Sequence, residues 1–109
     1  MFIAMNRFKV NAGHEDGFEG RWRGRDTYLQ DVPGFLAFSL LRNATTADGI
    51  TEFLSHSTWR SRDDFEAWRT SESFRMAHSQ GSVQGVLAGP PEALLYEVVI
   101  NESREKAGI

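Results

Sequence analysis

Asn6, Trp68 and His78 are the residues of this chain whose types and settings could do chemistry. Asn6 falls in the segment 2–10, where the other residues on its face are apolar, so its amide points to the side that a strand normally buries. A buried amide without hydrogen-bond partners costs about 1–3 kcal/mol. Either other groups of the protein form hydrogen bonds with the Asn6 amide, or the amide is kept for a ligand.

Trp68 and His78 lie on the apolar faces of two short helical segments further along the chain. An imidazole can bind a metal or exchange a proton near neutral pH, and an indole offers a broad flat surface with one N–H donor. Taken singly, each is more often structural than functional. Their convergence with Asn6 on the space between helices and sheet is typical of an apolar small-molecule site with a few polar groups.

Hydrophobic periodicity predicts the elements that must position these residues. We expect strands at 2–10, 35–41, 52–60 and 92–100, and helices at 14–29, 63–69 and 72–80. Polar or Gly- and Pro-rich connections are expected at 43–49 and 81–91, with a helical turn around 83–87, and N-caps at Ser61 and at Thr70-Ser71. The order β-α-β-β-α-β predicts an α+β, ferredoxin-like antiparallel sheet with helices on one face.

The first expected helix carries a stripe of residues at helical spacing: Phe18, Trp22, Arg25 and Leu29. Arg25 is an unusual residue for such a stripe. From the edge of the stripe its stem can extend so that the guanidinium reaches water.

The opposite face of the expected sheet, with Ile3 and Met5, has no element of this chain to cover it. A second copy packing its own sheet there would solve this, so the pattern predicts a symmetric homodimer.

Composition narrows the class of protein. A chain of 109 residues is expected to form one domain, 1–109, with a polar tail at 101–109. The net charge is -3 and no long basic run is present, which argues against a nucleic-acid partner. There is no Cys, no apolar stretch of membrane-spanning length and no signal-peptide pattern, so we expect a cytoplasmic protein without a membrane partner.

The ordered set of these features resembles the heme-degrading monooxygenases of the IsdG and HmuQ type. These enzymes belong to the dimeric α/β-barrel superfamily that includes the antibiotic-biosynthesis monooxygenases. The resemblance is carried by Asn6-Arg7, by Pro33-Gly34-Phe35, by the run from Thr58 to Ser61 with Phe65 and Trp68, and by Ser73 to His78. It covers nearly the whole chain, and Asn, Trp and His together are the catalytic signature of that family.

The resemblance implies a role for each of the three residues, with heme as both substrate and oxygen-activating group. His78 would be the axial ligand of the heme iron, Asn6 would donate a hydrogen bond on the opposite side, and Trp68 would press on the macrocycle and favour its ruffling. Trp22 and Arg25 match positions that face heme, and Arg25 would pair with a propionate. The remaining expected heme contacts are apolar: Phe65, Phe74, Val83 and Leu87. The last two belong to the loop 81–91, which is expected to close over heme.

The implied reaction is oxidative cleavage of heme to a biliverdin-type open tetrapyrrole with release of iron. Its electrons would come from a reductase or a small reductant, because the sequence has no flavin or nicotinamide motif. Two alternatives stay open. One is a cofactor-independent monooxygenase of a polycyclic phenol or quinol, and the other is a non-enzymatic heme carrier.

Overall fold

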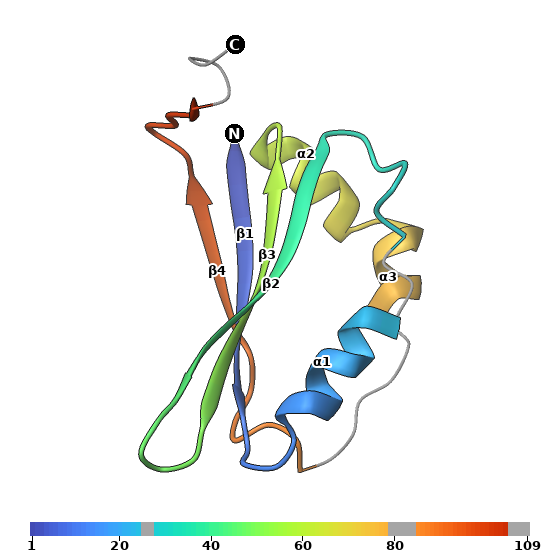
Figure 1. The fold of residues 1–109 in the computed structure, drawn as a ribbon. Coiled ribbons are helices and arrows are strands. Elements are labelled where there is room, and N and C mark those ends of the chain that lie inside the picture. The colour runs from blue at the N-terminus through green and yellow to red at the C-terminus, as the bar shows by residue number, and fades with distance from the viewer. Residues whose placement is uncertain (25–27, 79–84, 105–109) are drawn as a thin grey trace.

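The computed structural model describes residues 1–24, 28–78 and 85–104, and for Ser73, Ala77 and His78 the backbone alone (Figure 1). Its elements in chain order are β1 (Phe2–Val10), α1 (Glu15–Gly24), β2 (Phe35–Thr45), β3 (Thr51–Trp59), α2 (Arg62–Arg69), α3 (Glu72–His78) and β4 (Glu92–Glu97). The strands form one sheet in the order β2-β3-β1-β4, with every neighbouring pair antiparallel. All three helices lie on one face of this sheet (Figure 1). The expected ferredoxin-like α+β fold is therefore confirmed.

The helix-covered face of β1 is the one predicted from its alternation. Phe2, Ala4 and Val10 on that face are buried, and Asn6 between them is half-buried. On β3 the buried residues Phe53, Ser55 and Trp59 occupy the same face, because Phe2 pairs with Trp59 and Asn6 with Ser55. The central strands thus present a mostly apolar floor to the helices, with polar exceptions at Asn6 and at the serines of β3.

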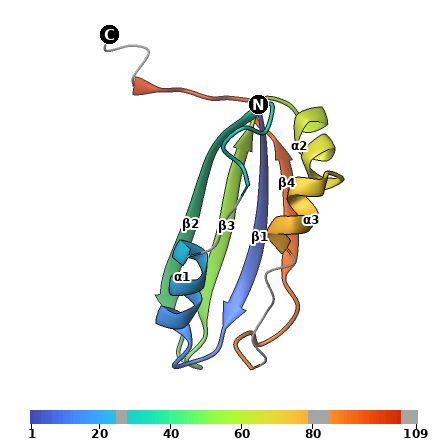
Figure 2. The same ribbon diagram turned by 90° about the vertical axis from the view of Figure 1, so that its right-hand side faces the viewer.

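Two apolar clusters make up the core on this side of the sheet. One contains Phe2, Ala4, Leu29, Trp59 and Phe65, and is called the upper cluster below. The other contains Val10, Phe18 and Phe53, and is called the lower cluster. Figure 2 faces the helix side: α1 lies toward β2, while α2 and α3 lie toward β4.

The first helix is shorter than the sequence indicated. It ends at Gly24 rather than at 29, and Tyr28 adopts a φ of 57°, which a helix does not allow. Leu29 consequently packs in the upper cluster and not along the stripe of Phe18 and Trp22, so that part of the predicted stripe was wrong. Three glycines weaken the helix, and the chain must turn away from it to reach the start of β2.

The turn before β2 brings segment 28–33 against α2. Gly34 has a φ of 81°, and a Cβ on it would lie 2.2 Å from Oδ2 of Asp64 on α2. Its carbonyl accepts a hydrogen bond from the N–H of Arg60 at 2.8 Å. Only glycine fits both the backbone conformation and the approach to the helix.

Two serine caps set the other helix starts, as predicted. The Oγ of Ser61 accepts from the N–H of Asp64 at 3.2 Å and begins α2. The Oγ of Ser71 accepts from the N–H of Phe74 at 3.2 Å and begins α3. No helix in the described ranges is long and apolar enough to cross a membrane.

Several other element boundaries also differ from the predicted ones, because pairing between distant segments decides where these elements end. β2 extends to Thr45, because the β3 strand beside it continues the ladder to the pair Thr45–Thr51. β4 ends at Glu97 rather than at 100. Residues 85–87 form no helical turn, and Leu87 instead makes an isolated bridge with Val10.

No helix of the described residues covers the opposite face of the sheet, which is called the open face below (Figure 1). The half-buried residues Ile3, Met5 and Leu54 occupy it, and Tyr96, paired with Ile3, is 54 % exposed. Arg7 on the same face pairs with Glu52 at 3.0 Å and with Glu92 at 3.6 Å. This face is apolar at one end and carries a compact charge cluster at the other.

Candidate functional site

Asn6 lies at the middle of the central strand β1, on the helix-covered face. Its backbone N–H donates to the Oγ of Ser55 at 3.2 Å. Its side-chain amide makes no hydrogen bond within the described part of the chain. One explanation for a polar residue at this position is that the protein itself supplies hydrogen-bond partners for the amide. The described residues do not support that explanation.

Asn6 also marks the boundary between the upper and lower clusters. Along β1, Phe2 and Ala4 belong to the upper cluster, whereas Val10 belongs to the lower one and Phe8 packs against it. The residues that pair with Asn6 across the sheet, Ser55 on β3 and Ala93 on β4, are small. The surface around the Asn6 amide is consequently formed by small side chains, and large aromatic side chains lie toward both ends of β1.

Trp68 packs against the upper cluster. It is half-buried on α2, and its indole packs against Trp59 with ring centroids 5.3 Å apart. Phe74 from α3 stands edge-on to the same indole at 4.7 Å. Aromatic neighbours on both sides fix the plane of the indole.

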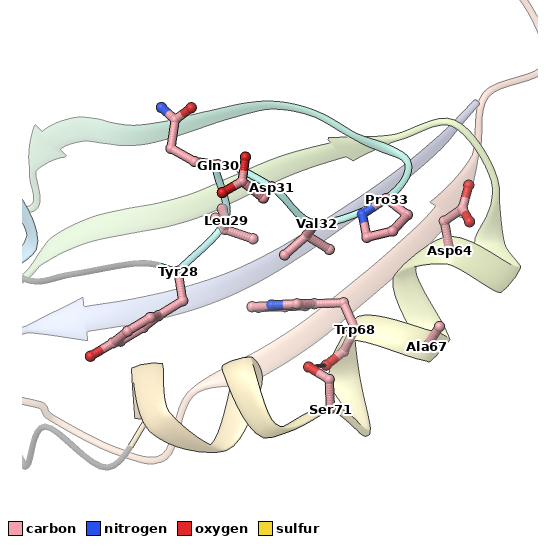
Figure 3. A pocket seen from close by; sticks show the side chains of 10 residues that line it. All are labelled: Tyr28, Leu29, Gln30, Asp31, Val32, Pro33, Asp64, Ala67, Trp68 and Ser71. Atoms are coloured by element: carbon pink, nitrogen blue, oxygen red, sulfur yellow. Dashed lines mark hydrogen bonds between the residues drawn. The ribbon is translucent and has the colours of Figure 1, made fainter.

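A cavity of about 530 Å³ lies beside Trp68, between α2 and segment 28–33 (Figure 3). Its volume is within the usual range for small-molecule sites. The described residues that line it are Tyr28, Leu29, Gln30, Asp31, Val32, Pro33, Asp64, Ala67, Trp68 and Ser71. Asn6 is not among them, so this cavity does not by itself bring the three predicted residues together.

Trp22 belongs to the lower side. It is half-buried on α1 and stacks on Phe38 of β2, with centroids 5.6 Å apart and planes at 16°. Its ring and that of Phe8 on β1 form an edge-to-face pair with centroids 5.7 Å apart. A smaller cavity of about 300 Å³ opens here, between α1 and the strands β2 and β3, with Trp22, Phe38, Leu40 and Phe53 in its apolar wall.

The rim of the smaller cavity is charged. Arg42 forms ion pairs with Glu19 and, at 3.7 Å, with Asp16, and its guanidinium lies 5.5 Å from the centre of the Phe53 ring. The hydrogen bond from Arg42 lowers the pKa of the Glu19 carboxyl below its ordinary value, and the same bond raises the pKa of Arg42. These groups tie α1 to β2 and hold Trp22 over the sheet.

Three of the apolar residues expected to contact heme lie in the described structure. Phe65 is only 7 % exposed and packs on Phe2, Trp59 and Trp68, so its surface is used largely within the core. Phe74 is half-buried against Trp68. Leu87 is half-buried against the lower cluster.

The described end of the loop 81–91 is fastened to β1. The N–H of Asn11 donates to the carbonyl of Val86 at 2.8 Å, its side chain donates to the carbonyl of Gly85 at 2.9 Å, and the N–H of Ala88 donates to the carbonyl of Lys9 at 2.8 Å. Residues 85–88 are therefore anchored beside the end of β1, and the expected closure of the loop 81–91 over heme stays a prediction.

Arg25 and Val83 lie outside the described residues. His78 is described by its backbone alone, in the last position of α3. The Ser71 hydroxyl donates to the carbonyl of Trp68 at 2.6 Å while it caps α3, so the start of the helix that carries His78 is hydrogen-bonded to the end of α2. The roles expected for Arg25, Val83 and the His78 imidazole stay predictions.

Sequence reasoning missed two residues that this geometry brings forward. Ser55 faces Asn6 directly, and Phe38 carries the ring on which Trp22 stacks. Ser55 could have been found by the signal that revealed Asn6, a polar side chain on an apolar strand face. Phe38 could not, because an irregularity between Phe35 and Ala37 shifts the face to which later β2 residues point.

Residues 1–80 match the family described as antibiotic biosynthesis monooxygenase. A heme-degrading monooxygenase of Bacillus cereus (strain B4264) is 30% identical over 95 residues, which cover 87% of this chain and 81% of that protein. The structure of the heme-degrader MhuD from Mycobacterium tuberculosis with two hemes bound in its active site superposes with a TM-score of 0.74 at 27% identity, covering 94% of this chain and 100% of that one. SnoaB of Streptomyces nogalater, a cofactor-independent oxygenase, shares the fold at a TM-score of 0.62 and 19% identity, covering 92% and 94% of the two chains.

Proposed function

The chain belongs to the antibiotic biosynthesis monooxygenase family, and we propose that within it the protein is a heme-degrading monooxygenase. The similarity to the Bacillus cereus enzyme and to MhuD supports heme as the ligand. The observation on this chain that carries the proposal is the half-buried Asn6 amide, which has no hydrogen bond among the described residues and stands between two aromatic-lined clusters.

Asn6 would serve as a hydrogen-bond donor toward the reacting oxygen. Heme supplies oxygen activation and is itself the substrate, so the protein's task is to orient it and to exclude other reactions. An amide at the centre of a paired strand is a rigid donor, because the backbone on both sides is held by neighbouring strands. A rigidly held donor would direct the reacting oxygen to one edge of the porphyrin macrocycle.

Trp68 and Trp22 would bound the ligand from the two sides. Each indole is braced by other rings, Trp68 by Trp59 and Phe74, and Trp22 by Phe38. A braced indole can press on a porphyrin without yielding, which suits the distortion that the family resemblance implies for Trp68. Phe74 and Leu87 would add apolar contacts, whereas Phe65 would act mainly by supporting Trp68.

His78 would be the axial ligand and Arg25 the partner of a propionate. Neutral imidazole suits heme iron, and a guanidinium suits a carboxylate. The chain has no Cys that could serve instead of His78. Val83 is retained as a further apolar contact from the loop. These assignments rest on the family resemblance.

The finer proposal concerns the reaction. Heme would be cleaved with O2 and external electrons to a biliverdin-type open tetrapyrrole, and iron would be released. The electron donor would be a separate reductase or a small reductant. Such an activity would make iron from heme available inside the cell.

The open face of the sheet supports a homodimer as the working form. Ile3, Met5 and Leu54 provide an apolar centre on this face. Two copies packing these faces together would remove this surface from water. The resulting pair of sheets would be the dimeric α/β barrel.

One titration tests the function. Hemin is added to the purified protein, the visible spectrum is recorded, and ascorbate is then supplied in air with catalase present. We expect a shifted Soret band that decays as long-wavelength absorption appears. A stable Soret band would identify a heme carrier instead, and an unshifted band would leave the cofactor-independent monooxygenase as the better reading.

A further inference from the structure

Ser55 is a buried polar residue on the mostly apolar face of the sheet that the helices cover. It is 7 % exposed, lies on the helix-covered face of β3, and pairs with Asn6 across the β1–β3 ladder. Its neighbour Ser57 on the same face has two fixed partners: its hydroxyl donates to the carbonyl of Ala4 at 3.1 Å and accepts from Nε1 of Trp59 at 2.9 Å. The hydroxyl of Ser57 therefore satisfies polar groups of the core, and the hydroxyl of Ser55 has a different partner.

The hydrogen bond of Ser55 goes to Asn6. Its Oγ accepts from the backbone N–H of Asn6 at 3.2 Å, a contact between residues 49 apart in the sequence. A hydroxyl that accepts one bond retains its own hydrogen and a second lone pair. Because the neighbouring side chain on β4 is Ala93, Ser55 is the polar group beside Asn6 in this row of the sheet.

We propose that Ser55 is the positioning residue for Asn6: its hydroxyl fixes the Asn6 peptide, and with it the direction in which the Asn6 amide projects from the sheet. The consequence for catalysis rests on the proposed function. If the Asn6 amide pointed in another direction, heme oxidation would no longer be confined to one edge of the macrocycle. The hold of Ser55 on Asn6 belongs to the heme-free protein and can be measured without heme.

Three variants separate this role from a structural one. Ser55→Ala removes the hydroxyl and keeps the small side chain, and Ser55→Thr restores a hydroxyl at the same position. Ser57→Ala is the control for a purely structural loss, because it removes a hydroxyl from the same strand and face together with its bonds to Ala4 and Trp59, and leaves the bond between Ser55 and Asn6 in place. All three are first compared by thermal unfolding.

The first measurement uses the heme-free protein. Nuclear magnetic resonance should show the backbone and side-chain amide signals of Asn6 moved in Ser55→Ala, restored in Ser55→Thr and unmoved in Ser57→Ala. Unmoved Asn6 signals in Ser55→Ala would overturn the proposal. This result is independent of whether the protein binds heme.

The second measurement uses the hemin complex, reduced with dithionite and saturated with carbon monoxide. The C–O stretching frequency responds to nearby hydrogen-bond donors. We expect Ser55→Ala to shift it toward the value of Asn6→Ala, at unchanged hemin affinity and with turnover about tenfold lower. A wild-type frequency in Ser55→Ala would overturn the proposal, while failure of the wild-type protein to bind hemin would instead overturn the proposed function.

Discussion

The ring of Phe74 stands edge-on to the indole of Trp68, with centroids 4.7 Å apart and planes at 82°. This contact joins α3 to α2, and the Ser71 hydroxyl reinforces it by donating to the carbonyl of Trp68 while it caps α3. The indole of Trp68 and the start of the helix that carries His78 are therefore in direct contact. We expect a substitution of Trp68 to alter the position of α3.

Substitution of Trp68 tests this coupling. Trp68→Ala should lower the free energy of unfolding by about 3 kcal/mol, the low end for a Trp in a core, because Trp68 is half-buried and its removal leaves a gap between Trp59 and Phe74. Trp68→Phe should keep most of the stability and hemin binding but reduce turnover, since a smaller ring presses less on the macrocycle. Chemical denaturation and the ascorbate assay measure the two effects. Full turnover in Trp68→Phe would remove the indole from the mechanism.

Asn6→Ala should separate function from stability. The Asn6 amide makes no hydrogen bond with described residues, so its removal should change the free energy of unfolding by less than about 1 kcal/mol. Hemin binding should persist and turnover should fall at least about tenfold. A loss of stability well above 1 kcal/mol with normal turnover would show that the amide is a structural group.

His78→Ala tests the axial ligand. The variant should bind hemin more weakly and show a Soret band and electron paramagnetic resonance signals different from wild type. His14→Ala is the control, because His14 is an exposed histidine just before α1, away from both the proposed site and the open face. A wild-type spectrum in His78→Ala, or an altered one in His14→Ala alone, would contradict the assignment.

The ion pair of Glu19 with Arg42 should make part of the stability depend on pH. The pKa of Glu19 in the folded protein lies below its ordinary value of 4.5 because of the Arg42 hydrogen bond. A carboxyl with a lowered folded pKa stabilises the protein above pH 4.5 and loses this contribution as the pH falls below 4.5. The stability difference between wild type and Glu19→Gln should thus be constant near neutral pH and shrink in acid. High salt should also reduce it, because the pair is partly exposed. A difference that grows in acid would be inconsistent with the ion pair.

Met5→Lys should disrupt the proposed homodimer. A charge at the centre of the open face would have to be buried without a partner when two copies pack together. Analytical ultracentrifugation should show a dimer for wild type and for Ala12→Lys, which adds the same charge at an exposed turn, and a monomer for Met5→Lys. A wild-type monomer at micromolar concentration would exclude the dimer.

Local patterns in the sequence determined most of the fold. The alternation of segment 2–10 placed Phe2, Asn6 and Val10 on the helix-covered face, and a serine three residues before an acidic position marked the start of α2. These signals need only neighbouring residues, because strand faces and helix caps are properties of a few consecutive peptides. The same local signal identified Asn6 as an anomaly.

The tertiary structure decided what depends on distant partners. Strand register set Ser55 opposite Asn6, and pairing with β3 extended β2 to Thr45. Leu29 joined the upper cluster because the turn at Gly34 carries its segment to α2, which no helical spacing could indicate. Register and packing are chosen by contacts between residues far apart in the chain, and a pattern of neighbours holds no information about them. The sequence by itself thus identified Asn6 as a polar group on a buried face. Only the folded chain showed that its side-chain amide lies between two clusters with Ser55 beside it and makes no hydrogen bond with the described residues.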